Sequence, residues 1–96
     1  MPDRVIVDRP VVAFIGELSL SRNALVRLYT QLHHELGNEA ARFRSTRHPE
    51  EPDLYFHYRI TVASGDLWHQ FDFAVNDTTA SDTLFVEAVS HTAWPW

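Results

Sequence analysis

The stretch LYFHYRITVASGDLWHQFDFAV, residues 54–75, alternates large apolar residues with polar ones on both sides of a Ser-Gly-Asp centre. An alternation with a period of two is typical of β-strands that have one buried face and one solvated face. Two such runs that flank a glycine predict a β-hairpin. This hairpin limits the possible folds more than any other segment, because its register follows from the sequence.

The register of the hairpin depends on which positions are apolar. These are even-numbered in the first strand and odd-numbered in the second. For both sets to lie on one face, the loop must contain an even number of residues. A two-residue turn at Gly65-Asp66 meets this condition, because glycine adopts the positive φ that tight hairpin turns require. Ile60 then faces Phe71; a four-residue loop would keep the same register, whereas a one-residue slip would pair core with solvent.

The second face of the predicted hairpin carries polar and aromatic side chains, with Arg59 opposite Asp72. Trp, Tyr and Arg often dominate the binding energy of protein interfaces. Trp68 is the strongest indication of a docking surface, since an exposed tryptophan leaves a large apolar area in water unless the chain's tail or a long loop covers it. The Arg59–Asp72 pair also has a purely structural explanation, because opposite charges stabilise neighbouring strands. The candidate binding residues are Tyr55, His57, Arg59, Trp68, Gln70 and Asp72.

Residues 21–36, SRNALVRLYTQLHHEL, have the pattern of an amphipathic helix. Leucines recur at spacings of three and four, which gathers them on one helical face. They are Leu25, Leu28, Leu32 and Leu36. Ser21 is a suitable N-cap, and Gly37 stands where a left-handed C-terminal cap is expected. A helix over these residues is therefore predicted.

The remaining segments predict further strands. Val5–Val7 and Val11–Ile15 are short apolar runs on either side of Pro10, and they predict two strands with a turn or one bent edge strand. Thr83–His91 predicts a last strand whose two faces are both apolar, which indicates an interior strand or one that ends in an interface. Residues 38–53 contain two prolines and predict a long loop.

These elements together predict one α+β domain over residues 1–96. Its core is an antiparallel sheet of four or five strands, with one amphipathic helix packed on one face, in the order β-(β)-α-β-β-β. A single helix covers only one face of such a sheet, so the other face is expected to meet solvent or a partner.

The charge of the chain is −5 and is unevenly distributed. Residues 50–96 contain eight acidic side chains and one basic side chain, Arg59. This distribution disfavours nucleic acid and favours a basic protein partner. The chain contains no cysteine, no long apolar run and no N-terminal segment that resembles a secretory signal, so we expect a cytoplasmic protein without membrane contact.

No recognisable catalytic or metal-binding motif is present. His57 is a diagonal neighbour of Asp72, but the nearest hydroxyl is that of Thr61, an ordinary strand residue, and no Gly-x-Ser-x-Gly sequence occurs. The six histidines lack the spacing of helical metal sites, and His57 and His69 fall on opposite faces of the hairpin. We therefore expect no catalytic residues, no metal and no cofactor.

The function that the sequence predicts best is that of a small non-catalytic binding protein. One form of this function is an inhibitor or immunity-type protein that binds a basic partner through the acidic, aromatic sheet face. A homo-oligomer, such as a dimer formed through the open face or the last strand, is the main alternative. A small-ligand-binding protein or an enzyme is the third.

Overall fold

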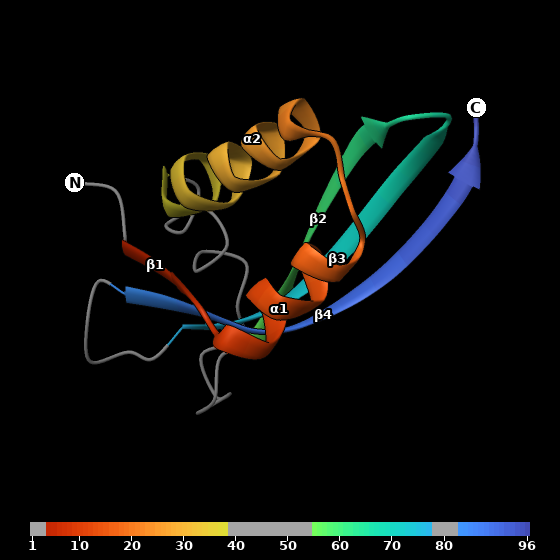
Figure 1. The fold of residues 1–96 in the computed structure, drawn as a ribbon. Coiled ribbons are helices and arrows are strands. Elements are labelled where there is room, and N and C mark those ends of the chain that lie inside the picture. Colours follow the sequence, from red (N-terminus) through yellow and green to blue (C-terminus); the bar gives the residue numbers. More distant parts are fainter. Residues whose placement is uncertain (1–3, 39–54, 78–82) are drawn as a thin grey trace.

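The computed structural model describes residues 4–38, 55–77 and 83–96. In these residues the fold is α+β, with a curled, mixed sheet of four strands whose concave face is covered by helices (Figure 1). The elements are β1 (Arg4–Val7), α1 (Arg9–Glu17), α2 (Arg22–Thr30), η1 (Gln31–Glu35), β2 (Tyr55–Ser64), β3 (Leu67–Asp77) and β4 (Thr83–Pro95). The loop predicted at 38–53 lies outside the described residues, except for Asn38.

The predicted hairpin is confirmed. Strands β2 and β3 pair in the expected antiparallel register, with Ile60 opposite Phe71, around a two-residue turn. Gly65 in this turn has a φ of 60°, the left-handed conformation that favours glycine. The inward-facing residues Ile60, Phe71 and Phe73 are buried in one core with apolar side chains of the helices.

The prediction of a strand at Val11–Ile15 is wrong, because these residues belong to helix α1. Asp8 is extended and acts as the N-cap residue, and Pro10 lies in the first turn, where its missing N–H is not needed. Val11 and Ile15 are buried four residues apart, which is helical spacing. An apolar run of this length fits a strand and a buried helical turn equally well. The structure consequently has two helical segments on the sheet, not one.

Helix α1 ends in a left-handed residue. Leu18 closes the last turn by donating its N–H to the carbonyl of Ile15, and Ser19 follows with a φ of 53°. Helices often end with such a residue, and glycine is the usual choice because it has no Cβ to clash with the following carbonyl. Ser19 is therefore a strained position on the path from α1 to α2.

Replacing Ser19 with Gly should raise the free energy of unfolding by up to about 1 kcal/mol, because relief of the left-handed strain exceeds the added freedom of the unfolded chain. The same change at Ser90, an exposed residue in β4, should instead lower it by about 0.5–1 kcal/mol. Urea unfolding of both variants tests this contrast. Equal changes of one sign at the two positions would contradict the account of Ser19.

The predicted start of the main helix is confirmed. The hydroxyl oxygen of Ser21 accepts a hydrogen bond of 3.2 Å from the N–H of Ala24, as expected of an N-cap. The N–H of Ser21 in turn donates to the hydroxyl of Ser64, at 2.8 Å. Ser64 is the last residue of β2, so this bond ties the start of α2 to the hairpin beside its turn.

The predicted helix end at Gly37 is wrong, since the helical conformation continues through Asn38. The helix contains a π turn, η1, in which Leu36 donates its N–H to the carbonyl of Gln31, five residues earlier. Gly37 is buried, and packing of its neighbour Leu36 in the core outweighs the poor helix propensity of glycine. None of the helices in the described part of the chain is long and apolar enough to cross a membrane.

The sheet has the strand order β1-β4-β3-β2, so β4 is an interior strand where β1 flanks it. The expectation of a purely antiparallel sheet is wrong at one pair, because β1 runs parallel to β4 with Val5 opposite Leu84. The Asp8 N–H extends this pairing by donating to the carbonyl of Val86 at 3.0 Å. The direction of β1 results from the return of the chain through α1 and α2 across the sheet, which no local pattern records.

A β-bulge in β4 explains why its two faces could not be distinguished. Val75 pairs with Val86 and Ala74 pairs with Ala88, which leaves Glu87 as an extra residue. Such a residue interrupts the alternation of inward and outward side chains. Inward positions are therefore even-numbered before Glu87 and odd-numbered after it, as the burial of Val86 and the partial burial of Val89 show.

Candidate functional site

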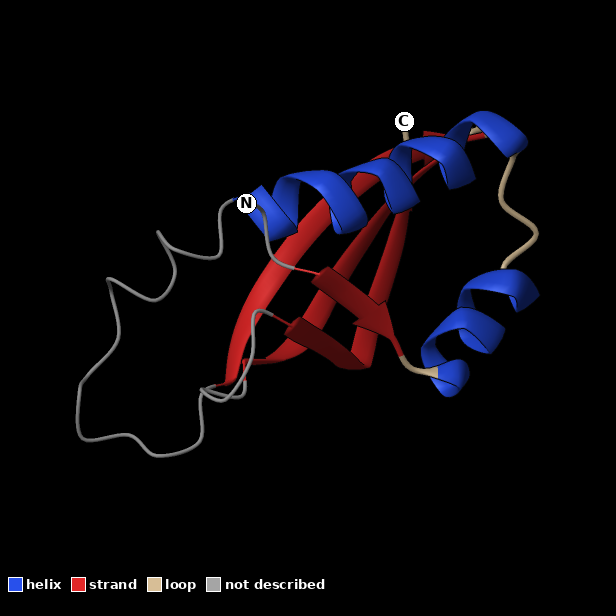
Figure 2. Ribbon diagram, turned by 90° about the vertical axis from the view of Figure 1, so that its left-hand side faces the viewer, coloured by secondary structure: helices blue, strands red, loops and turns tan. Residues whose placement is uncertain are grey.

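The open face of the sheet is the side opposite the helices (Figure 2). On this side lie the odd-numbered positions of β2 and the even-numbered positions of β3, because their neighbours in the strands point into the core. Five of the predicted binding residues share this face: His57, Arg59, Trp68, Gln70 and Asp72. Tyr55 pairs with Asn76 in the same register, but its side chain lies outside the described part of the structure.

Arg59 and Asp72 form the predicted cross-strand pair, with 2.9 Å between Nε and Oδ1. The second carboxylate oxygen of Asp72 accepts a hydrogen bond from Gln70 at 3.3 Å. The hydrogen bond from Arg59 holds the pKa of Asp72 below its usual value, and burial opposes this shift. His57 adds a small effect in the same direction as Arg59, which agrees with its predicted diagonal position. Both oxygens of Asp72 are thus engaged in a charged surface network.

Three tryptophans gather at one end of the open face, and two of them were not included in the prediction. Strand β4 continues to Pro95, so Trp94 lies directly opposite Trp68. The ring of Trp96 stacks on that of Trp68, with 5.2 Å between centroids and 23° between planes. The tail therefore covers part of Trp68. We call Trp68, Trp94 and Trp96 the tryptophan cluster.

The tryptophan cluster is only partly shielded from water. Trp94 is 39 % exposed and Trp96 is 73 % exposed. The backbone N–H of Trp96 donates to the carbonyl of Asp66 at 3.2 Å, which fixes the end of β4 beside the hairpin turn. The sequence prediction ends this strand at His91. The alternation of Ser90, Thr92 and Trp94 on one face is the signal that indicates the longer strand.

Carboxylates outnumber cations around the open face. The described carboxylates are those of Asp66 in the turn, of Asp72, and of Glu87, which accepts a hydrogen bond from Asn76 at 3.2 Å. In the described residues of the hairpin and β4, Arg59 is the one arginine, and it is already paired with Asp72. Asp66 is the one of these three carboxylates beside the tryptophan cluster, while Asp72 and Glu87 lie further along the sheet.

A pair of histidines lies on the inner face of the sheet, which is the side covered by the helices, behind the tryptophan cluster. His69 occupies the core side of β3 as predicted and is 7 % exposed. His91 was expected at a strand end but lies within β4, where the bulge turns it inward. Its Nε2 is 2.9 Å from Nδ1 of His69. Burial lowers the pKa of His91, and the neighbouring His69 lowers it further.

Aromatic side chains surround the histidine pair on the inner face. The ring of His91 lies 4.9 Å from that of Phe71 and 5.8 Å from that of Phe14 in α1. His69 also lines an open pocket of ≈ 510 Å³ between the hairpin turn and the segment that joins the helices. No group of three or more His, Cys, Asp or Glu side chains suited to a metal ion occurs in residues 4–38, 55–77 and 83–96.

The arrangement combines an exposed aromatic cluster, an ion pair whose members bind each other, and a partly buried histidine pair on the opposite face. Because Arg59 and Asp72 bind each other on the open face, these side chains are suited to forming a contact surface for a partner. Comparisons of the chain with protein-family models, with curated proteins and with solved structures find no match.

Proposed function

We propose that this protein is a non-catalytic binding protein that docks a basic partner protein through the open face of its sheet. The observation that carries the proposal is the tryptophan cluster, because Trp94 and Trp96 leave large apolar rings in water. Exposed apolar patches of this kind typically mark sites of protein interaction. Tryptophan is also among the residues that contribute most to binding energy at interfaces.

The charges around the cluster favour a basic partner. An arginine or lysine placed over an indole ring is attracted by the negative face of the ring, by about 0.5–2 kcal/mol depending on exposure. Asp66 adds a carboxylate beside Trp96, so a cation there gains an ionic contact as well. Nucleic acid is a poor partner for the same reason, since its phosphates need Arg or Lys side chains.

Inhibition is one form that this function can take. A partner with a basic active site would place its cations against Asp66 and the tryptophan cluster, and the open face of the curled sheet would block access to that site. Arg59 and Asp72 would lie further along the same face, where their mutual pairing limits the cost of bringing them out of water. An immunity-type protein is accordingly the form of binding protein that we favour.

A short basic peptide should bind at the cluster and change the tryptophan fluorescence. The test uses a peptide of alternating Gly and Arg and an isosteric peptide with citrulline in place of Arg. We expect the citrulline peptide to bind at least about 10-fold more weakly, because it has lost the charge but not the shape. Trp94→Ala and Asp66→Asn should each weaken binding of the arginine peptide, whereas Val26→Ala, an exposed apolar change on α2, should not.

Equal affinity for the two peptides, or for wild type and Trp94→Ala, would contradict docking of a basic partner at the cluster. Self-association is the competing function, favoured by the exposure of Trp94 on the open face. Light scattering at micromolar concentration distinguishes the two. A dimer that Trp94→Ala converts to a monomer would assign the cluster to self-association.

A further inference from the structure

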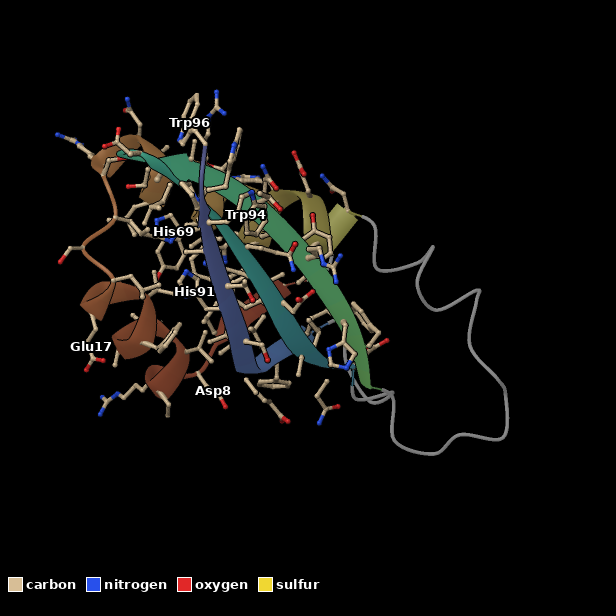
Figure 3. All side chains as sticks on the ribbon, turned by 90° about the vertical axis from the view of Figure 1, so that its right-hand side faces the viewer. Asp8, Glu17, His69, His91, Trp94 and Trp96 are labelled. Atoms are coloured by element: carbon tan, nitrogen blue, oxygen red, sulfur yellow. The ribbon has the colours of Figure 1, made fainter. Side chains whose placement is uncertain are left out.

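The histidine pair and the tryptophan cluster occupy opposite faces of the same short piece of sheet. Trp68 and His69 are consecutive in β3, and their partners in β4 are Trp94 and Ala93. Figure 3 shows His69 and His91 close together beside β4, with Trp94 and Trp96 further along that strand. Any change in the β3–β4 pairing at His69 therefore displaces the indole rings on the other face.

On the inner face, the pair is the last partly buried contact between β3 and β4 before the hairpin turn. On the inner face, the next residue of β3 towards the turn is Leu67, which is 38 % exposed. Its counterpart in β4 is Pro95, which is exposed, and Ala93 opposite His69 is exposed as well. In the described structure, the contact between His69 and His91 is thus the side-chain contact between β3 and β4 that lies nearest this end of the inner face.

The contact requires at least one neutral ring. At 2.9 Å, one ring nitrogen donates a proton and the other accepts it. When both rings are protonated, both facing nitrogens carry protons, so the hydrogen bond is lost and two cations repel each other. His91 would then also be a cation packed between Phe14 and Phe71.

No described carboxylate offsets the charge on His91. On the inner face, the titratable group that faces His91 is His69 of β3, while α1 contributes the ring of Phe14. Asp8 and Glu17 lie at the two ends of α1 and project away from the pair (Figure 3). Asp66 lines the same open pocket as His69, from the turn, and the carboxylate of Asp72 is engaged by Arg59 on the open face.

We propose that the His69–His91 pair makes the docking surface pH-dependent, so that the tryptophan cluster is assembled at neutral pH and comes apart when both rings are protonated. His69 lines the open pocket beside the turn, so protons can reach the pair without unfolding of the core. The structural step depends only on the pair, and its effect on binding rests on the proposed function.

The direction of the effect follows from the lowered pKa of His91. We call the pair closed when its hydrogen bond is made and open when that bond is broken. A histidine outside this environment has a pKa of 6.5, and the closed pair holds the pKa of His91 below this value. As the pH falls through 6.5, the open form takes up the proton first. Relative to the open form, the closed form therefore loses stability as the pH falls from 6.5 to the lower pKa of His91. Its stability does not increase above neutral pH.

The stacked rings of Trp68 and Trp96 provide a partner-free measurement, because neighbouring indoles give a coupled circular-dichroism signal. Lowering the pH from about 7.5 to about 5.5 should remove at least half of this signal, in the range where histidine titrates. His91→Phe keeps an aromatic ring between Phe14 and Phe71 but cannot titrate, so it should keep the signal. His34→Gln, a change at an exposed position of η1, should retain the wild-type transition.

Binding of the arginine peptide gives the second measurement, since its guanidinium groups do not titrate in this range. We expect wild type to lose at least about fivefold in affinity over the same pH interval, and His91→Phe to lose less than about twofold. A constant dichroism signal in wild type, or the same transition in His91→Phe, would overturn the proposal. If His91→Phe does not fold, nuclear magnetic resonance titration of wild type decides, and independent titration of His69 and His91 contradicts it.

The two proposals fail in different ways. A pH-dependent dichroism signal without peptide binding at any pH supports the histidine pair as the control of the cluster and contradicts the docking function. Peptide binding that is equally tight at both pH values supports docking and contradicts the control by the pair.

Discussion

Phe71→Ala is expected to lower the free energy of unfolding by about 3–5 kcal/mol, the range observed when a large buried aromatic is truncated. Phe71 is fully buried at the centre of the sheet. It faces Ile60 on one side and His91 on the other, and its ring lies 6.0 Å from that of Phe73. These neighbours belong to three different strands, so they cannot close the cavity without moving the sheet.

A loss of this size removes a large part of the stability of a domain of this length, which is typically about 5–15 kcal/mol. Urea unfolding followed by far-ultraviolet circular dichroism measures it. Phe85→Ala is the matched control, because Phe85 is only half-buried in β4 and points away from the main core. A cost at Phe71 no larger than that at Phe85 would show that the strands do not pack as described.

Leu32→Ala is expected to lower the free energy of unfolding by about 2–5 kcal/mol, because it leaves a cavity beneath the π turn. Buried residues of this helix follow one another at intervals of four: Ala24, Leu28, Leu32 and Leu36. In a regular α-helix, each such interval rotates the side chain by about 40° around the axis. The wider η1 turn compensates for this rotation, so that Leu32 and Leu36 both remain fully buried.

The control for this variant is Val26→Ala on the exposed side of α2, where Val26 is 57 % exposed. It should change stability by less than about 0.5 kcal/mol, as surface substitutions usually do. Thermal unfolding of both variants at one pH gives the comparison. If Leu32→Ala proved as mild as Val26→Ala, the π turn would not be presenting Leu32 to the core.

The β2–β3 hairpin and the start of α2 could be predicted because their determinants are local. The period of two and the glycine turn lie within one continuous segment, and together they exclude a one-residue slip. Ser21 and the leucines that follow it likewise define their own helix. For the same reason, the open-face positions of His57, Arg59, Trp68, Gln70 and Asp72 were available from the sequence.

The inner and outer contacts of β4 could not be obtained in this way. Its bulge at Glu87 reverses the alternation, and the bulge exists only relative to the partner strand β3. Until that register is known, His91 cannot be placed on the inner face or Trp94 opposite Trp68. The histidine pair and two thirds of the tryptophan cluster therefore depend on a pairing between segments that are distant in sequence.

In the first part of the chain, too, the structure depends on contacts between distant segments that the sequence does not show. Val11–Ile15 is too short for its periodicity to separate strand from helix, and burial against β4 decides in favour of α1. The parallel direction of β1 has no local marker either, because it depends on how the chain crosses the sheet between β1 and β2. Patterns confined to one segment were thus enough for the hairpin and the start of the main helix. The packing of distant segments, which alone buries their remaining apolar surface, selected α1, the mixed sheet and the site at its end.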